Sequence, residues 1–329
     1  MHFINGPVKW GILGCGDVCE VKSGPAFRKI PNSSLVAVMR RDRAKAEDFA
    51  KRHEVPTFYD DATRLINDPN VNAIYIATPP DSHKALAIEA IKAGKPVYVE
   101  KPASTNTSDC REMIAAAEQY QIPVTVAHYR RYLALFERIR SLILEQAIGE
   151  VRMVTLTLFQ APKVGAVPSE NWRISPTISG GGLLFDLAPH QLDIIYWLFG
   201  APKKVNSIST NQGGFYSAPD VTAMSAIFGD DIVFQGLWSF NSPPHAQADV
   251  VKIIGASGTL EFPFFASFEE SKLHILKGNN STVEQFVFPQ HIQQPMIEQV
   301  VKFFQGKASN PCPLQDALVT LAMIEEAHQ

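Results

Sequence analysis

Residues 8–19 read Val-Lys-Trp-Gly-Ile-Leu-Gly-Cys-Gly-Asp-Val-Cys, an apolar run that ends in a glycine-rich turn. This order is typical of the first strand and first turn of a dinucleotide-binding unit. Gly14 permits the tight turn, and Gly16 allows backbone N–H groups to approach a pyrophosphate where the next helix begins. Cys19 departs from the usual third glycine or alanine but is still small. The predicted pyrophosphate contacts are Gly14, Cys15, Gly16, Asp17 and Val18.

Short apolar runs alternate with amphipathic stretches through the first third of the chain. The runs indicate buried strands at residues 8–13, 35–39, 73–77, 97–99 and 124–127. Apolar positions at helical spacing indicate helices at residues 43–53, 82–93 and 108–120. Because parallel strands need helical crossovers, this alternation predicts an α/β fold with a doubly wound parallel sheet. We expect this domain to span residues 1–126.

The pattern changes after about residue 125. A helix at residues 133–146 is followed by runs that alternate or are β-branched, at residues 151–159, 205–210, 221–228, 232–240, 248–254, 273–276 and 283–288. Turn residues separate several of these runs, as hairpins require. The sequence therefore predicts an α+β domain over residues 127–329 with a large, mostly antiparallel open sheet. A sheet covered by helices on one face needs a partner on the other, which predicts a homodimer or homotetramer.

Composition excludes several classes of protein. The chain has 329 residues, 46% of them hydrophobic, and 30 basic residues nearly balance 33 acidic ones. No broad basic surface for nucleic acid follows from this balance. No uninterrupted apolar stretch approaches the roughly 18 residues that cross a bilayer. The four cysteines are too few and too scattered to form a disulfide framework, so we expect a cytoplasmic protein that binds neither nucleic acid nor membrane.

The end of the second predicted strand bears on the choice of cofactor. An NAD site typically places an acidic residue there, whereas this chain has Arg40 and Arg41 followed by Asp42. Two guanidinium groups suit a 2′-phosphate by charge and by geometry. NADP is therefore the preferred cofactor, and Asp42 leaves NAD open.

Two further motifs follow predicted strands, where a nicotinamide ring is expected. Residues 77–83 read Ala-Thr-Pro-Pro-Asp-Ser-His, and Thr78, Pro79 and His83 are candidate cofactor contacts. Glu100-Lys101-Pro102 follows the next strand. A lysine held there between a glutamate and a proline is a candidate acid/base group.

Residues 180–193 read Gly-Gly-Gly-Leu-Leu-Phe-Asp-Leu-Ala-Pro-His-Gln-Leu-Asp. In a helix, Asp186 and His190 lie one turn apart, so the carboxylate can orient the imidazole and stabilise its protonated form. This pairing predicts a general base. Pro189 disturbs the simple helix, because it removes one hydrogen bond. No third ligand stands at zinc-like spacing, and we predict no metal.

The ordered set of these motifs resembles the glucose-fructose oxidoreductase, inositol dehydrogenase and MocA family (Gfo/Idh/MocA), from residue 8 to at least residue 258. The resemblance implies an N-terminal Rossmann domain and a C-terminal α+β domain whose open sheet forms oligomer contacts. It places the family's lysine at Lys101 and its Asp-x-x-x-His pair at Asp186 and His190.

The resemblance also implies further contacts. Thr78, His83 and Glu100 match positions that line the cofactor, and Trp172 with Arg173 resembles a pair near the nicotinamide. Tyr129-Arg130-Arg131 stands where the family commonly has Asn-Arg-Arg, so Tyr129 and Arg130 are looser candidates for substrate contacts. The predicted substrate-binding set is Lys101, Tyr129, Arg130, Asp186 and His190.

The residues and the resemblance together predict an NAD(P)-dependent enzyme that moves a hydride between nicotinamide and a carbinol carbon of a sugar, polyol or related small molecule. His190 would accept the hydroxyl proton while Lys101 binds the same oxygen, or the two roles are exchanged. A dihydrodiol dehydrogenase-like xenobiotic reductase and a non-catalytic dinucleotide-binding regulator remain alternatives. Dihydrodiol dehydrogenases carry tyrosine in place of His190, which favours sugars or polyols. Loops at residues 161–179 and 243–247 are expected to build the substrate pocket.

Overall fold

The computed structural model describes residues 1–162, 171–265 and 271–327. The chain forms two compact units, each with its own sheet. The first consists of Met1–Arg130 and Pro289–Leu318, and the second of Arg131–Phe288 and Val319–Gln329.

The first unit contains a six-stranded parallel sheet in the order β3-β2-β1-β4-β5-β6. Its strands are β1 (Val8–Leu13), β2 (Ser33–Met39), β3 (Thr57–Tyr59), β4 (Ala73–Ile76), β5 (Val97–Val99) and β6 (Val124–Val126). Every residue of β4, β5 and β6 is buried, as expected for parallel strands covered on both faces. The strand order reverses between β1 and β4, and ligands of such sheets bind beyond the strand ends at that point. The predicted doubly wound sheet is confirmed.

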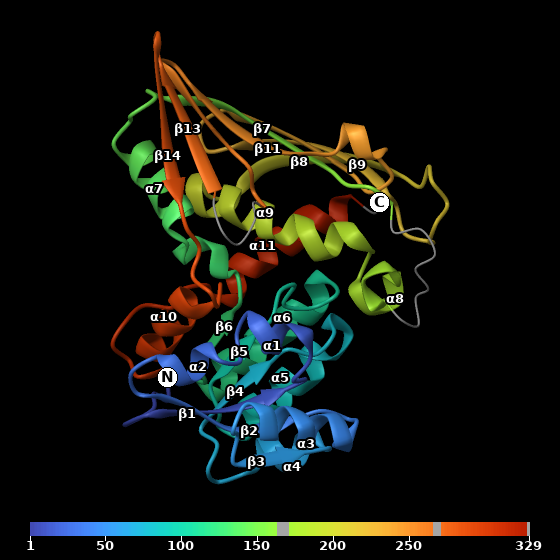
Figure 1. Ribbon diagram of the computed structural model, residues 1–329, viewed down its shortest axis with the longest axis vertical. Coiled ribbons are helices and arrows are strands. Elements are labelled where there is room, and N and C mark those ends of the chain that lie inside the picture. The colour runs from blue at the N-terminus through green and yellow to red at the C-terminus, as the bar shows by residue number, and fades with distance from the viewer. Residues whose placement is uncertain (163–170, 266–270, 328–329) are drawn as a thin grey trace. The chain divides into compact units, whose positions relative to one another are not determined.

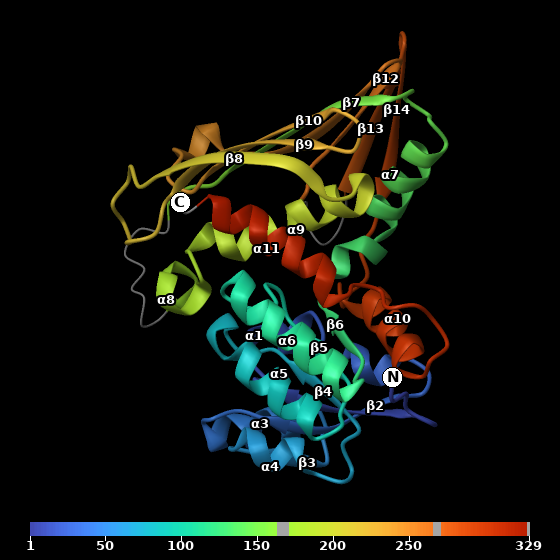
Figure 2. The ribbon, with the colours of Figure 1, turned by 180° about the vertical axis from the view of Figure 1, so that it is seen from behind.

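Helices cover both faces of this sheet (Figures 1 and 2). They are α1 (Asp17–Val21), α2 (Ala26–Lys29), α3 (Arg43–Arg52), α4 (Ala62–Ile66), α5 (His83–Lys92), α6 (Thr107–Tyr120) and α10 (Gln294–Phe304), with short 3₁₀ turns η1 (Pro80–Ser82) and η2 (Tyr129–Tyr132). The first crossover is broken between α1 and α2. A Cβ atom at Gly24 would lie 2.2 Å from the carbonyl oxygen of Cys19, so only glycine allows the chain to turn this closely.

The predicted division of the chain at residue 126 differs from the observed one, because Pro289–Leu318 belongs to the first unit. Its backbone completes the edge strand β6: Val126 donates its N–H to the carbonyl of Cys312 at 2.9 Å. The Asn310 amide also donates to the carbonyl of Val124 at 2.8 Å, and α10 packs against α2. Apolar periodicity indicates that a helix has a buried face but not which sheet that face covers, so the sequence did not reveal this return.

The second unit contains an eight-stranded sheet in the order β14-β13-β12-β11-β7-β10-β9-β8. Its strands are β7 (Val151–Phe159), β8 (Pro202–Thr210), β9 (Val221–Phe228), β10 (Ile232–Ser239), β11 (Ala248–Gly255), β12 (Gly258–Phe262), β13 (Ser271–Lys277) and β14 (Asn280–Phe286). Only β7 and β10 pair in parallel among these strands. The predicted, mostly antiparallel sheet is confirmed.

Helices α7 (Ala134–Leu144) and α9 (Leu183–Phe199) lie against the same face of this sheet (Figures 1 and 2). The remaining helical segments are η3 (Trp172–Ile174), α8 (Pro176–Ser179), η4 (Pro244–Ala246) and α11 (Leu314–Glu326). Alternate residues of the central strands are buried, among them Leu156, Trp238 and Ile253. This period-2 alternation is why the sequence indicated strands there.

Candidate active site

The glycine-rich turn follows β1 and precedes α1. Gly14 has φ of +87°, and a Cβ atom there would lie 2.8 Å from the backbone nitrogen of Thr78. A Cβ atom at Gly16 would meet nothing within 4 Å. Gly14 is therefore required by close packing against the end of β4, whereas Gly16 faces open space that a ligand can approach. The side chain of Cys19 is completely buried, and burial raises the pKa of its thiol.

Cys15 lies between these glycines and is also buried. Burial raises the pKa of its thiol to about 11, and the nearby guanidinium of Arg40 opposes this rise. A thiol with this pKa is neutral at physiological pH. Cys15 therefore contributes its backbone and small size to the turn, and no negative charge that would repel a phosphate.

The predicted cofactor-selecting arginines follow β2. Arg40 is half-buried and Arg41 is exposed, and neither guanidinium has a hydrogen-bond or ion-pair partner among the described residues. Asp42 has a different role, because its carboxylate caps α3 by accepting a hydrogen bond from the N–H of Lys45 at 3.2 Å. That bond holds the pKa of Asp42 below its usual range. The two cations are available at this strand end, while the acidic side chain is occupied.

His83 connects the two motifs that follow β4 and β5. Its side chain is completely buried, with Nε2 2.8 Å from the carbonyl oxygen of Thr78 and Nδ1 2.9 Å from that of Pro102. Burial lowers the pKa of the imidazole. The ring thus contacts both the Thr78–Pro79 loop and the loop that carries Lys101, and its direct contact with the cofactor stays a prediction.

Glu100 is 8% exposed, and its carboxylate forms the centre of a buried network. Tyr75 donates its hydroxyl to Glu100 Oε1 at 2.5 Å, and the Lys101 N–H donates to Oε2 at 3.3 Å. Gln293 supplies a second donor to Oε1. Burial and the neighbouring carboxylate raise the pKa of Tyr75 well above its usual value. Lys101 is half-buried, and its peptide bond to Pro102 is cis.

Sequence reasoning missed Tyr75 and Gln293. Tyr75 stands in the run Ala-Ile-Tyr-Ile of β4, where a polar hydroxyl in a fully buried strand requires a partner. That requirement was a usable signal for a polar network. Gln293 gave no such signal, because a lone glutamine far along the chain has no motif around it.

In the second unit, the glycine cluster starts α9. Ser179 Oγ accepts the N–H of Gly182 at 2.8 Å, and Gly182 has φ of +83° with no room for a Cβ atom against Ala218. α9 continues through Pro189 to Phe199. The predicted helix over Asp186 and His190 is therefore present despite the internal proline.

Asp186 forms an ion pair with Arg173, at 3.1 Å between Oδ2 and Nε. The Arg173 guanidinium also lies 4.6 Å from the centre of the Trp172 ring. His190 is buried, and its ring contacts Phe265 edge to face at 6.0 Å. The pairing of Asp186 with His190 stays a prediction. The structure shows that the Asp186 carboxylate, which was expected to orient the imidazole, also binds Arg173.

Tyr129 and Arg130 are both buried, and the guanidinium lies 5.7 Å from the centre of the tyrosine ring. Their contact with substrate stays a prediction. The next residue, Arg131, forms a buried ion pair with Asp193 of α9, at 2.6 Å between Nη2 and Oδ1. Sequence reasoning missed this pair, although Asp193 follows His190 by one helical turn.

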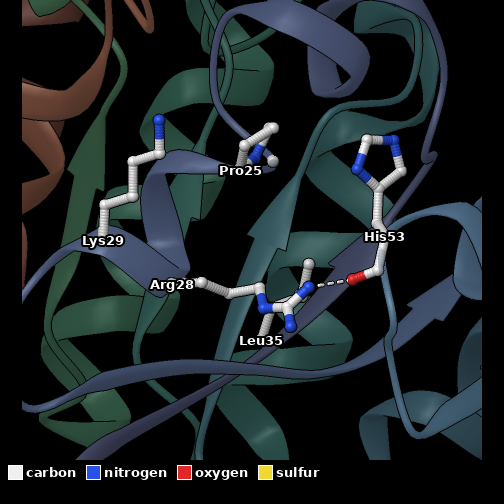
Figure 3. Close-up of a pocket in the computed structure, with 6 residues that line it drawn as sticks. Pro25, Arg28, Lys29, Leu35 and His53 are labelled. Carbon is white, nitrogen blue, oxygen red and sulfur yellow. Dashed lines mark hydrogen bonds between the residues drawn. The ribbon is translucent and has the colours of Figure 1, made fainter.

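One small cavity of about 200 Å³ lies in the first unit beside the break between α1 and α2 (Figure 3). It is lined by Gly24, Pro25, Arg28, Lys29, Leu35 and His53. None of these residues belongs to the predicted cofactor set. Residues 163–170 of the expected substrate loop lie outside the described residues. Among the described residues, no group of three or more histidine, cysteine or acidic side chains is arranged to hold a metal ion.

Comparison with known proteins identifies the family to which the chain belongs. Residues 8–128 match the model of an oxidoreductase family with an NAD-binding Rossmann fold, and residues 136–261 match the Gfo/Idh/MocA C-terminal domain. The chain belongs to the Gfo/Idh/MocA oxidoreductase family. It is an NAD(P)-dependent oxidoreductase.

Individual relatives of this Gfo/Idh/MocA protein span most or part of its length. Oxidoreductase P35 of Formosa agariphila is 38% identical over 322 residues, covering 97% of each chain. The pig trans-1,2-dihydrobenzene-1,2-diol dehydrogenase is 31% identical over 206 residues, which are 61% of this chain and 59% of that enzyme. The aldose-aldose oxidoreductase of Caulobacter crescentus, solved with glycerol, shares the fold with a TM-score of 0.85 at 21% identity, over 97% of this chain and 96% of that chain.

Within the described ranges, every helix is too short or too polar to cross a membrane.

Proposed function

We propose that this protein oxidises a carbinol, or reduces the corresponding carbonyl, of a sugar, polyol or related small molecule, and prefers NADP. The single observation that carries the proposal is the Glu100–Lys101 loop, whose lysine follows a buried carboxylate anchored at the end of β5. A lysine held at a strand end of a dinucleotide-binding sheet is placed to act on substrate.

The residues of the glycine-rich turn fit a dinucleotide. Gly16 leaves open the space in which a Cβ atom would stand, and backbone N–H groups at the start of a helix have no partners within it. Arg40 and Arg41 suit a 2′-phosphate, while Asp42 is engaged as a helix cap. These features support NADP over NAD.

The bound nicotinamide ring would accept or supply the hydride at its C4 atom. In the oxidation direction, His190 accepts the proton of the substrate hydroxyl, and Lys101 donates a hydrogen bond to the same oxygen and stabilises its developing negative charge. Asp186, itself paired with Arg173, orients the imidazole. In reduction each proton movement is reversed, and the roles of Lys101 and His190 are exchangeable in this scheme. Trp172, Tyr129 and Arg130 are proposed to line the site.

The uncovered face of the second sheet supports self-association. Register aligns Ile208, Ala223 and Leu237 in one row across β8, β9 and β10, and Ile208 is 77% exposed. Met153 and Leu276 lie in another row farther along the same face, and both are also exposed. We propose that a second copy of the chain covers this face, as a homodimer or as half of a homotetramer.

All four cysteines are buried, and a cytoplasmic location remains our proposal.

The test is a screen of sugars, polyols and dihydrodiols as substrates, in which hydride transfer is monitored through the absorbance of NADPH. Lys101→Met should abolish turnover while NADPH binding survives. A variant that keeps its activity would refute the role of Lys101. Turnover confined to dihydrodiols would favour the second candidate, which the similarity to the pig enzyme supports. Tight NADPH binding without turnover of any compound would favour a regulator.

A further inference from the structure

Gln293 connects three parts of the first unit that are distant in sequence. Its side chain is completely buried. Its amide nitrogen donates to Glu100 Oε1 at 2.6 Å, and its amide oxygen accepts the hydroxyl of Tyr98 at 3.2 Å. Its backbone N–H donates to the carbonyl of Lys22, directly after α1, at 3.2 Å. One residue thus contacts the end of α1, the β5 strand and the Glu100 carboxylate.

The residues just before Gln293 reinforce this attachment. His291 Nδ1 lies 2.7 Å from the carbonyl oxygen of Val21, the last residue of α1, and Nε2 lies 2.8 Å from Lys29 Nζ. The His291 side chain is buried. Helix α1 begins at the glycine-rich turn, so the segment from His291 to Gln293 binds one end of that helix and reaches Glu100 as well.

We propose that Gln293 is a positioning residue that fixes Lys101 relative to the glycine-rich turn by holding the carboxylate of Glu100. The inference rests on the proposed function, in which Lys101 acts on the substrate oxygen. The coupling is direct. Glu100 Oε1 accepts a hydrogen bond from the amide of Gln293, and Glu100 Oε2 accepts one from the N–H of Lys101. Movement of the carboxylate therefore changes the backbone position of the lysine.

A glutamine suits this position for a chemical reason. Its neutral amide donates toward Glu100 and accepts from Tyr98 at the same time, whereas a carboxylate only accepts. A leucine of similar volume would leave the Tyr98 hydroxyl without its acceptor. It would also remove one of the two side-chain hydrogen bonds to Glu100 Oε1 and leave the one from Tyr75. Leaving a buried polar group without its partner is costly, and the members of a buried network are coupled, so we expect the Glu100 carboxylate to change position.

The first experiment compares Gln293→Leu with the matched control Gln294→Leu, a half-buried glutamine at the adjacent position. We expect Gln293→Leu to lower kcat about 10- to 100-fold, since a misplacement near 1 Å has that effect. The Kd for NADPH should change by less than about threefold. Gln294→Leu should match the wild type in kcat and in the Kd for NADPH. Equal kcat values for the two variants would overturn the inference.

A second experiment uses pH to separate positioning from a general loss of stability. Gln293→Glu preserves shape but places a second carboxyl within hydrogen-bond distance of Glu100. Titratable groups that act on or face Glu100 are Cys19, Tyr75, His83, Tyr98 and Lys101. At low pH the new carboxyl is protonated and can donate as the amide does, but its ionisation at higher pH makes two carboxylates repel.

We therefore expect kcat of Gln293→Glu, relative to the wild type, to be nearly normal at pH 5 and to fall as pH rises to 8. Gln293→Leu should show a constant reduction over the same range. A purely structural role predicts parallel profiles for the two variants, and that result would contradict the proposal. If Gln293→Leu does not fold, Tyr75→Phe removes the other donor to Glu100 Oε1 while it keeps the ring, and it should lower kcat in the same way.

A third measurement needs no substrate. Reductive ¹³C-methylation labels the lysines, and the Lys101 resonance is the one that disappears in Lys101→Met. Its chemical shift should change in Gln293→Leu, because the lysine is displaced, and remain unchanged in Gln294→Leu. If Lys101→Met is active, the proposed function fails. If Lys101→Met is inactive but Gln293→Leu matches the wild type in kcat and in this resonance, only the inference about Gln293 fails.

Discussion

Arg131 and Asp193 form a bidentate ion pair inside the second unit, with Nε–Oδ2 and Nη2–Oδ1 distances of 2.9 and 2.6 Å. Both side chains are at most 3% exposed. Asp193 lies on α9 one turn after His190, so the pair anchors the helix that carries the proposed base. Burying two charges is costly, and their mutual contact compensates for that cost only while both are present.

Removal of one partner should therefore be severe. We expect Asp193→Asn or Arg131→Met to lower the free energy of unfolding by about 3–5 kcal/mol in urea titrations. The control is Glu284→Gln, which breaks a pair with Arg138 whose side chains are about one-third exposed, and should cost about 0–1 kcal/mol. Similar losses for the buried and the exposed pair would show that burial does not determine the strength of the first.

The two glycines of the turn should respond differently to the same change. Gly14→Ala forces a Cβ atom against the backbone of Thr78 at a positive φ, and should lower both Tm and NADPH affinity. Gly16→Ala meets no protein atom within 4 Å, so Tm should stay within about 2 °C while NADPH affinity falls. Calorimetry and fluorescence titration measure these two quantities. Normal NADPH binding by Gly16→Ala would place the pyrophosphate elsewhere.

Cofactor preference should depend on the arginines after β2. Arg40→Ala and Arg41→Ala should each weaken NADPH binding about tenfold or more, because each removes charge-assisted hydrogen bonds to the 2′-phosphate. NADH binding should change little. Lys51→Ala, an exposed cation at the far end of α3, is the control of equal charge. An unchanged ratio of NADPH to NADH affinity in Arg40→Ala would refute the assignment.

Stability in acid should depend on Glu20. Hydrogen bonds from Arg52 and His53 lower the pKa of Glu20 to about 2, from a usual value of 4.5. Between these pH values the unfolded chain binds more protons than the folded one, so stability falls as pH falls through this window. Urea unfolding of Glu20→Gln should show a weaker dependence on pH from 4.5 to 2 than the wild type. Identical slopes would show that the ion pair does not persist in solution.

Association should depend on the uncovered sheet face. Ile208→Asp and Leu237→Lys should each shift the protein toward monomer in analytical ultracentrifugation, since each places a charge in the apolar row. Val287→Asp changes a residue that is 75% exposed but follows β14, and should keep the native mass. A wild-type protein that is monomeric at micromolar concentration would contradict the proposal.

The sequence predicted elements with a strong local period and missed those without one. β1 is an apolar run broken only by Lys9, β4 is buried throughout, and both strands are confirmed. β3 (Thr57–Tyr59) was missed, because its three residues are half-buried and too few to show a period. β12 (Gly258–Phe262) was also missed; it begins with glycine, which weakens a strand pattern.

The candidate site was predictable where motifs follow strands. Gly14, Glu100 and Lys101 could be located because they come directly after buried runs. The partners that hold them could not, since contacts between residues 193 positions apart, such as Glu100 and Gln293, leave no local pattern. The engagement of Asp42 as a helix cap, by contrast, could have been predicted, because Asp42 directly precedes the helix expected at residues 43–53.

The return of Pro289–Leu318 to the first unit has a consequence for biosynthesis. Protein domains generally fold as they emerge from the ribosome, N-terminal parts first. Here the edge strand β6 and the Glu100 carboxylate have partners among residues 291–312, so the nucleotide-binding half is completed only after the strands of the second sheet have been synthesised. For the same reason, no single proteolytic cut releases that half intact.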